Sequence, residues 1–334
     1  MSVRPTEARF PGASRAAGMY ESFYLRACDP AERRGVWVRY TVHTRPGVEP
    51  RASVWFVLWD PAAGPPYAVK QTYPAPALGS GDGDLIRIGD SRLQERSASG
   101  RVEGEGRTAS WQLELDGTEP PLLHLPREWM YDAPLPRTKT LSPLPVARFG
   151  GRIEAGGRTV EADGWVGMMG HNWGAQHAER WIWMHGLAFD GTAADGVWID
   201  AAIGRIKLGP WTTPWIANGE LCLGGRRYRL GGIERARSTR IDESPNRARF
   251  VLPGKGVRVT GEVGSDRSDF VGWIYSDPDG GRHDTVNCSI AAMKLKVERA
   301  GEEPVALTTS GGATYELGMR ERDHGVALQP FPDP

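Results

Sequence analysis

The side chains best suited to chemistry lie in one aromatic-rich part of the sequence. His171-Asn172-Trp173 is followed by Trp181-Ile182-Trp183-Met184-His185 and then by Val197-Trp198-Ile199-Asp200. An imidazole changes charge near neutral pH, and removal from water favours the protonated form of a carboxyl group. Aromatic faces stabilise positive charge. Together these residue types are suited to proton transfer onto an apolar, electron-rich substrate.

Asp200 is the first candidate catalytic residue. We expect it in the middle of a strand among apolar neighbours, where burial should raise the pKa of its carboxyl group and produce a general acid. This role requires Asp200 to face a cavity. The alternatives are a solvated carboxylate, or one paired with Arg205 or Lys207.

His171 is the second candidate catalytic residue. It could orient Asp200, relay a proton or act as the acid itself. A histidine beside a tryptophan could equally be a packed, hydrogen-bonded residue. Because His171 and Trp173 are two positions apart, an extended segment would place both side chains on one side.

Alternation along strands groups the aromatic side chains. In an extended segment 181–189, Trp181, Trp183 and His185 share one face, and Trp198 and Asp200 share one face of the next strand. Whether these two faces coincide depends on the register across the turn 190–196, because a slip of one residue reverses every side chain. The sequence leaves both registers open.

The chain contains 13 tryptophans, and many of them fall in its second half. Any one of them could belong to the hydrophobic core, but together they fit the wall of a pocket for a large flat or polyene-like ligand. Tyr275 and Glu316 are weaker polar candidates. The predicted substrate-binding residues are Trp173, Trp181, Trp183, His185, Trp198 and Trp273.

Composition excludes several functions. The 334 residues include 41 basic and 41 acidic side chains, so the chain lacks the basic footprint of a nucleic-acid-binding protein. The N-terminus does not resemble a signal peptide, and no run approaches the roughly 20 apolar residues of a membrane span. The separated Cys28, Cys222 and Cys288 suggest no disulfide framework. We expect a cytoplasmic protein without stable membrane insertion, and the sequence leaves its oligomeric state open.

The sequence gives no motif support for a cofactor. It contains none of the nucleotide-binding, P-loop, serine-hydrolase or HExxH patterns. His171, His177 and His185 do not have a usual zinc-ligand spacing. We therefore expect neither a cofactor nor a metal.

The pattern of short apolar segments predicts an almost entirely β protein. The 43 glycines and 26 prolines are dispersed between segments rich in β-branched and aromatic residues, and we find no convincing long amphipathic helix. Antiparallel barrels would protect the strand edges and enclose pockets. The predicted strands are 36–42, 53–59, 110–115, 181–189, 197–203, 257–263, 270–275 and 286–297.

An internal similarity suggests two related halves. Glu21-Ser22-Phe23-Tyr24, followed by Val36-Trp37-Val38, resembles Glu179-Arg180-Trp181-Ile182, followed by Val197-Trp198-Ile199. The identities are few, and chance could supply them. We place the domains at residues 1–165 and 166–334, with the active site at their junction.

At these residues the chain resembles the lipocalin-like family of carotenoid 1,2-hydratases (hydroxyneurosporene synthases), which also contains AttH-type proteins and cyclases of secondary metabolism. The resemblance rests on His171-x-Trp173, on Trp198-Ile199-Asp200, on Glu179-Arg180-Trp181 and on Gly311-Gly312-Ala313-Thr314-Tyr315-Glu316. It is specific over residues 165–205. It implies two tandem lipocalin-like antiparallel β-barrel domains and a cofactor-free reaction on an isoprenoid or polyketide-like substrate.

The resemblance also implies roles for individual residues. In the hydratases, the residues matching His171, Trp173 and Asp200 are implicated in protonating a carbon–carbon double bond, after which water captures the tertiary cation. We therefore expect a cofactor-independent hydratase, cyclase or isomerase acting on a hydrophobic, unsaturated small molecule. The alternatives are a non-catalytic carrier of hydrophobic ligands and a pericyclic cyclase that only folds its substrate.

Overall fold

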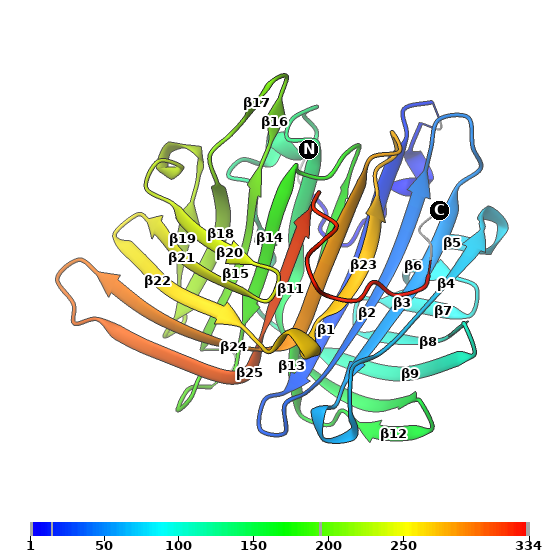
Figure 1. Cartoon of the computed structure of the whole chain (residues 1–334), viewed down its shortest axis with the longest axis horizontal. Coiled ribbons are helices and arrows are strands. Elements are labelled where there is room, and N and C mark those ends of the chain that lie inside the picture. The colour runs from blue at the N-terminus through cyan, green and yellow to red at the C-terminus, as the bar shows by residue number, and fades with distance from the viewer. Residues whose placement is uncertain (1–2, 15, 194–195, 332–334) are drawn as a thin grey trace.

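The prediction of an all-β protein is confirmed. The computed structural model describes residues 3–14, 16–193 and 196–331, and their regular elements are strands and short 3-10 helices (Figure 1). No helix among these residues has the length and apolar character needed to cross a membrane. The 3-10 helices are η1 (Phe10–Gly12), η2 (Pro61–Ala63), η3 (Ala75–Ala77), η4 (Glu128–Tyr131), η5 (Ile233–Arg235) and η6 (Arg267–Asp269).

The first sheet has 13 strands within the described residues and is antiparallel throughout. It curls into a barrel, since the backbone N–H of Glu103 donates to Oε1 of Gln71 at 2.9 Å and brings β8 beside β4. Its main path is β4 (Tyr67–Pro74), β3 (Arg51–Trp59), β2 (Arg34–Thr44), β1 (Met19–Asp29), β13 (Trp165–Gly174), β11 (Thr138–Ala155), β9 (Arg107–Asp116), β8 (Ser97–Gly104), β7 (Ser91–Gln94), β6 (Asp84–Ile88) and β5 (Leu78–Gly81). Two short strands, β10 (Leu122–Leu123) and β12 (Arg158–Glu161), pair with β11.

The second sheet has 10 strands in the described part of the chain. The pairing of Leu230 with Gly254 joins β19 to β21 and closes a barrel. The path is β19 (Arg226–Gly231), β18 (Ile216–Leu223), β15 (Val197–Arg205), β14 (Arg180–Gly186), β25 (Val305–Met319), β24 (Arg282–Arg299), β22 (Val257–Gly264), β21 (Arg247–Gly254) and β20 (Arg240–Ser244), with β23 (Val271–Ser276) paired to β24. A separate hairpin joins β16 (Lys207–Leu208) to β17 (Trp211–Thr212).

Each predicted strand overlaps an observed one, and the largest overshoot is at the end of the segment 181–189. The segment expected to be extended over 181–189 leaves the sheet after Gly186. Ala188 has a φ of 50°, a left-handed conformation that is uncommon for a residue with a side chain and lies outside the β region. The chain therefore turns out of β14 before Phe189.

The two halves share a topology. The first strand of each half pairs with the last strand of that half, β1 with β13 and β14 with β25. Because β13 lies between β1 and β11, residues 166–174 belong to the first sheet. The chain therefore passes from one sheet to the other in residues 175–179, later than the predicted division between residues 165 and 166.

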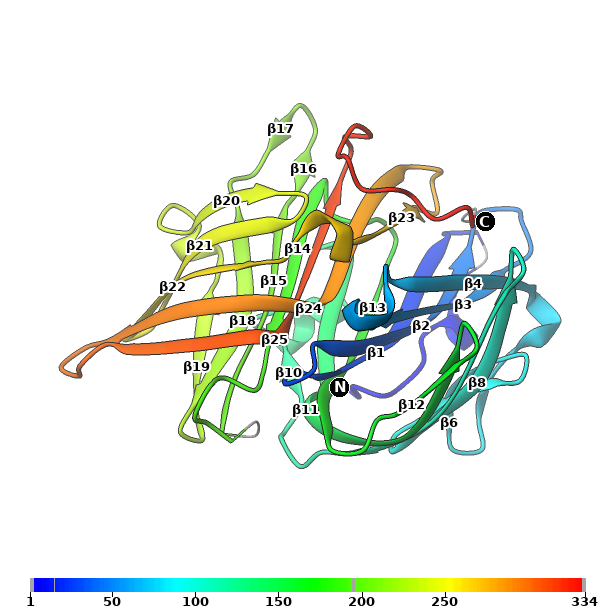
Figure 2. The ribbon, with the colours of Figure 1, turned by 60° about the horizontal axis from the view of Figure 1, so that its bottom comes forward.

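The barrels pack side by side through the outer faces of their sheets (Figure 2). Trp37 and Trp55 point away from the interior of the first barrel and meet Trp273 of β23, with ring centroids 6.3 and 5.1 Å apart. Trp59 donates its indole N–H to the carbonyl oxygen of Asp269 at 2.7 Å. A buried aromatic interface thus joins the halves.

Cys28, Cys222 and Cys288 are buried and unpaired. This agrees with the expectation that the chain has no disulfide framework.

Candidate active site at the junction of the barrels

The register of β14 and β15 resolves which candidate side chains share a face. His185 is opposite Asp200, and Trp183 is opposite Ala202. Directly opposed residues in an antiparallel pair lie on the same face, so Trp181, Trp183 and His185 share a face with Trp198 and Asp200. The turn between these strands includes residues 194 and 195, which lie outside the described residues.

This shared face is the outside of the second barrel. The alternate residues, including Met184 and Ile199, belong to the hydrophobic core. Trp183, in contrast, packs against Tyr24 and Met168 of the first barrel. The candidate site therefore lies between the barrels and is built from both.

Asp200 is fully buried and is held by side chains from both barrels. Ser142 on β11 donates its hydroxyl to Oδ2 at 2.6 Å, and Trp183 donates its indole N–H to Oδ1 at 3.1 Å. The Nε2 atom of His124, which follows β10, lies 3.5 Å from Oδ2. Both carboxyl oxygens thus have polar partners within a buried site.

The hydrogen bonds of His124 fix its tautomer. Nδ1 lies 3.0 Å from the carbonyl oxygen of Asn218, which can only accept, so Nδ1 carries a hydrogen. Nε2 is then the nitrogen that faces Ser142 at 3.4 Å and Asp200. The Ser142 hydroxyl hydrogen is already donated to Asp200, so Ser142 is not the donor between His124 and Asp200. A proton shared by these two residues therefore lies on Nε2 of His124 or on the Asp200 carboxyl group.

The expected protonation of Asp200 needs correction. Burial by itself would raise the pKa of this carboxyl group, but the charge of His124 and the hydrogen bonds from His124 and Ser142 outweigh burial and lower the pKa to about 2. Asp200 is therefore a carboxylate at neutral pH. A proton delivered from this pair comes from His124.

A second carboxyl group, Glu316 on β25, lies in the same interface. It accepts hydrogen bonds from Trp181 Nε1 at 3.0 Å, from Asn287 Nδ2 at 3.2 Å and from the Tyr275 hydroxyl at 3.3 Å. The Arg39 guanidinium lies 4.0 Å from the centre of the Tyr275 ring. The two weaker sequence candidates, Tyr275 and Glu316, therefore belong to this site.

Tyr24 on β1 packs edge to face against Trp183, the indole donor to Asp200, with ring centroids 5.1 Å apart. Burial first, and then the negative charges of Asp200 and Glu316, raise the pKa of its phenol well above the ordinary range. Tyr24 therefore keeps its proton at neutral pH. Gly170, its partner on β13, makes room for the ring: a Cβ there would lie 2.1 Å from Cζ of Tyr24.

His171 does not meet Asp200. Its Nε2 lies 2.8 Å from Glu21 Oε1, its Nδ1 lies 2.9 Å from the carbonyl oxygen of Pro5, and its ring stacks on Phe23. Met168 on the same strand faces the second barrel, so the alternation of β13 turns His171 to the opposite side, into the first barrel. The expectation that His171 and Asp200 share one chamber is not met, because the first sheet lies between them.

Trp173 lies on the His171 side of β13. Its ring centroid is 4.6 Å from that of His171 and 5.8 Å from that of Tyr131, and the Arg9 guanidinium lies 4.9 Å from its ring. It therefore packs away from Asp200.

Three other residues that were predicted to bind the substrate are instead packed against neighbouring parts of the protein. His185 is fully buried; its Nε2 lies 2.9 Å from the carbonyl oxygen of Pro145 and its Nδ1 lies 3.3 Å from Nη1 of Arg26. Trp198 is fully buried, and Trp273 is 1% exposed within the interface between the barrels. Of the predicted aromatic wall, Trp181 and Trp183 remain in the candidate site.

Four further residues of this site were not predicted from the sequence: Tyr24, Arg39, His124 and Ser142. His124 carried a usable signal, because a histidine in the apolar run Leu122-Leu123-His124-Leu125 needs a buried partner. The other three carried none, since a tyrosine, an arginine or a serine in a strand is ordinary.

Comparisons with known proteins agree with this architecture. No protein-family model matches the chain. Uncharacterised proteins of Mycobacterium tuberculosis strains H37Rv and CDC 1551 are 26% identical over 322 residues, which cover 91% of this chain and 88% of theirs.

Three solved structures share the fold. An AttH-like protein from Nitrosomonas europaea has a TM-score of 0.54 and 14% identity, with 95% of this chain and 99% of that chain covered. CghA, in a structure with Sch210972, has a TM-score of 0.55 and 12% identity, with 95% of each chain covered. Kievitone hydratase from Nectria haematococca has a TM-score of 0.53 and 12% identity, with 96% and 93% covered. The predicted resemblance to AttH-type proteins is confirmed at the level of the fold.

Proposed function

We propose that this chain is a hydratase or cyclase that protonates a double bond of a hydrophobic, unsaturated small molecule at the junction of the two barrels. The observation that carries the proposal is the buried Asp200, held by Trp183 and Ser142 and facing the Nε2 atom of His124. Two titratable side chains in a water-poor, aromatic setting are the components of general acid–base catalysis. Protonation of the double bond is a proton transfer, for which these two side chains are sufficient.

In the proposed reaction the proton starts on His124, whose charge is balanced by the Asp200 carboxylate. It passes from the pair of His124 and Asp200 to the double bond, while the Tyr24 phenol, which packs against Trp183, stays neutral. One carbon of the double bond takes the proton, and the other becomes a cation. Such general-acid transfer contributes roughly 100- to 10,000-fold to the rate.

The cation then has two fates. Addition of water gives an alcohol, and attack by a second double bond of the same molecule gives a ring. In either case the proton released afterwards goes to a carboxylate, for which Glu316 is suitably placed. The aromatic ring of Trp183 stabilises the cation until then.

The structural neighbours support this class of reaction without identifying the substrate. One of them is a hydratase by name, and another holds a small molecule in its structure. We favour an isoprenoid as substrate, because protonation of its branched double bonds gives tertiary cations. A cytoplasmic location is part of the proposal and agrees with the unpaired Cys28, Cys222 and Cys288.

The first experiment identifies the ligand class. Native mass spectrometry of the protein purified from its own host should detect a co-purifying apolar molecule. Its carbon skeleton determines which polyenes enter the assay. The protein is then incubated with these polyenes in D2O, where protonation of a double bond produces a carbon-bound deuterium that mass spectrometry detects.

Asp200→Asn tests the catalytic assignment. We expect this variant to lose at least about 100-fold in turnover, while polyenes still quench its tryptophan fluorescence. His171→Gln is the matched control, because His171 lies on the other side of the first sheet and should be dispensable for turnover. Near-normal deuterium incorporation by Asp200→Asn would reject the proposal.

Two other results would redirect the assignment. Fluorescence quenching by polyenes without any product from the wild-type protein would identify a carrier of hydrophobic ligands. A modest slowing in Asp200→Asn, with an altered product distribution in Trp183→Phe, would identify a pericyclic cyclase that only folds its substrate.

A further inference from the structure

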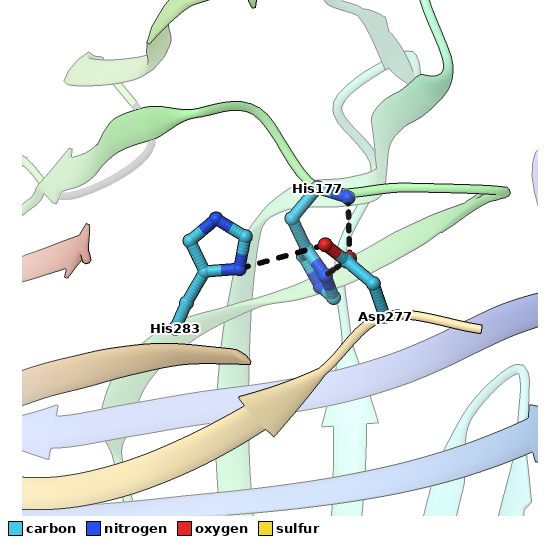
Figure 3. A group of neighbouring side chains, drawn as sticks. All are labelled: His177, Asp277 and His283. Atoms are coloured by element: carbon cyan, nitrogen blue, oxygen red, sulfur yellow. Dashed lines mark hydrogen bonds and ion pairs between the residues drawn. The ribbon is translucent and has the colours of Figure 1, made fainter. Parts of the chain in front are cut away.

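We propose that His177, Asp277 and His283 form a binding site for a divalent first-row transition-metal ion. One ligand atom from each side chain lies within 4.8 Å of the other two (Figure 3). Nδ1 of His177 is 2.7 Å from Oδ1 of Asp277, and Nδ1 of His283 is 3.7 Å from Oδ2 of the same carboxyl group. The Asp277 carboxyl group thus lies between two imidazoles.

The cluster contains buried polar atoms whose hydrogen-bonding capacity is unused. Among the described residues, Oδ2 of Asp277, Nε2 of His177 and both ring nitrogens of His283 make no hydrogen bond of normal geometry. The backbone of Ala178 makes only a weak hydrogen bond to the His283 ring. Buried polar atoms without partners are costly, and a metal ion would satisfy several of them at once.

The fold brings the three residues together from distant parts of the sequence. His177 lies on the segment 175–179 that connects the two sheets. Asp277 follows β23, and His283 is the second residue of β24, after the same turn. The backbone N–H of His177 also donates to Oδ1 of Asp277 at 2.7 Å. This contact anchors the connecting segment to the second sheet.

Aromatic packing holds the imidazoles in place. The His177 ring stacks on Tyr20, with centroids 3.9 Å apart, and on Trp181, with centroids 5.2 Å apart. Trp181 also meets His283 edge to face at 5.0 Å. Side chains fixed in this way lose little freedom when they bind an ion.

The donor set determines which ions fit. Two imidazole nitrogens and one carboxylate oxygen are the protein ligands of many catalytic zinc sites and of non-haem iron sites, and both types leave coordination positions open for water. Bonds of about 2.0–2.1 Å to zinc place neighbouring ligand atoms roughly 3 Å apart. The three ligand atoms, which lie within 4.8 Å of one another, therefore have to move closer together to bind the ion.

The surrounding charges are balanced. The Arg320 guanidinium lies near the turn that carries Asp277, and it pairs with Glu179 at 3.4 Å. Arg282, next to His283, pairs with Asp284 at 2.8 Å. These pairs leave the charge of Asp277 available to a cation.

Spacing along the sequence did not predict this site, because two of its three residues lie about a hundred positions after His177. The proposal also does not depend on the acid–base chemistry at Asp200. A failure of either proposal would leave the other standing.

The experiment is a metal titration of the full chain after treatment with a chelator. We expect one Zn2+ per chain by calorimetry, and Co2+ should give visible absorption bands of a site with nitrogen ligands. His283→Gln and Asp277→Asn should each weaken Zn2+ binding by at least about 100-fold, since even residues that only support a ligand contribute 10- to 100-fold. Circular dichroism checks that each variant folds.

His324→Gln is the matched control, because His324 is also buried and lies 3.4 Å from a carboxylate, that of Asp284. It should bind Zn2+ as the wild type does. A wild-type protein without stoichiometric binding, or with binding that both ligand variants retain, would overturn the proposal.

X-ray absorption spectroscopy of the Zn2+-loaded wild type needs no variant. It should show imidazole ligands at about 2.0–2.1 Å. A shell made only of water or carboxylate oxygens would overturn the proposal as well.

Discussion

Acidification should destabilise the protein through His185, and the structure predicts by how much. Nδ1 of His185 faces the Arg26 guanidinium at 3.3 Å, and its Nε2 donates to the Pro145 carbonyl oxygen at 2.9 Å. A second proton would therefore sit on Nδ1, against a positive charge and away from water. Burial first, and then Arg26, lower the pKa of His185 from 6.5 to about 4, against the opposing effect of Asp200.

The direction and the size of this loss of stability on acidification follow from proton linkage. Below pH 6.5 the unfolded chain binds a proton at His185 and the folded chain does not. The contribution of this difference to the unfolding free energy is therefore fully present above pH 6.5 and is lost as the pH falls to about 4. The gap between these two values, at ~1.4 kcal/mol per pH unit, corresponds to about 3 kcal/mol. This is an effect of one fully buried side chain.

The measurement is urea-induced unfolding of the wild type and of His185→Gln at intervals from pH 7 to pH 4. The variant cannot titrate at this position, so other groups contribute equally to both proteins. The difference in unfolding free energy between them should therefore shift by about 3 kcal/mol over this range, with the wild type losing more. A difference that stays constant with pH would refute the reasoning.

Two further substitutions test the packing of the site. Ser142→Ala removes the hydroxyl donor to the Asp200 carboxylate, so unfolding at pH 7 should require ~1.5–3 kcal/mol less free energy. The low pKa of Asp200 stabilises the fold above about pH 4, and this stabilisation is lost as the pH falls to about 2. The variant should therefore lose less unfolding free energy than the wild type on acidification. Unchanged urea unfolding would contradict this role. Gly170→Ala places a Cβ 2.1 Å from the Tyr24 ring, so it should lower the unfolding free energy by ~1–3 kcal/mol and impair turnover. Gly150→Ala is the control, because the nearest atom to its Cβ lies 3.4 Å away, and it should unfold like the wild type.

The sequence was sufficient for the fold class and for much of the strand pattern. β-Branched and aromatic segments between glycines and prolines identified β2, β3, β15 and β24, because strand preference and turn chemistry are local properties. Local alternation also grouped Trp181, Trp183 and His185 on one face. The end of β14 was not predictable, since it depends on the unusual backbone conformation of Ala188.

The partners of each face depend on strand register and on the packing of one barrel against the other, which involve residues far apart in the sequence. Only the tertiary structure placed Asp200 beside His124 and Ser142, and this proximity made it a carboxylate where burial by itself predicted an acid. The same long-range pairing turned His171 into the other barrel and brought His177 to Asp277. Local residue order defines which side chains alternate along each strand, whereas the neighbours of those side chains depend on how the two sheets assemble.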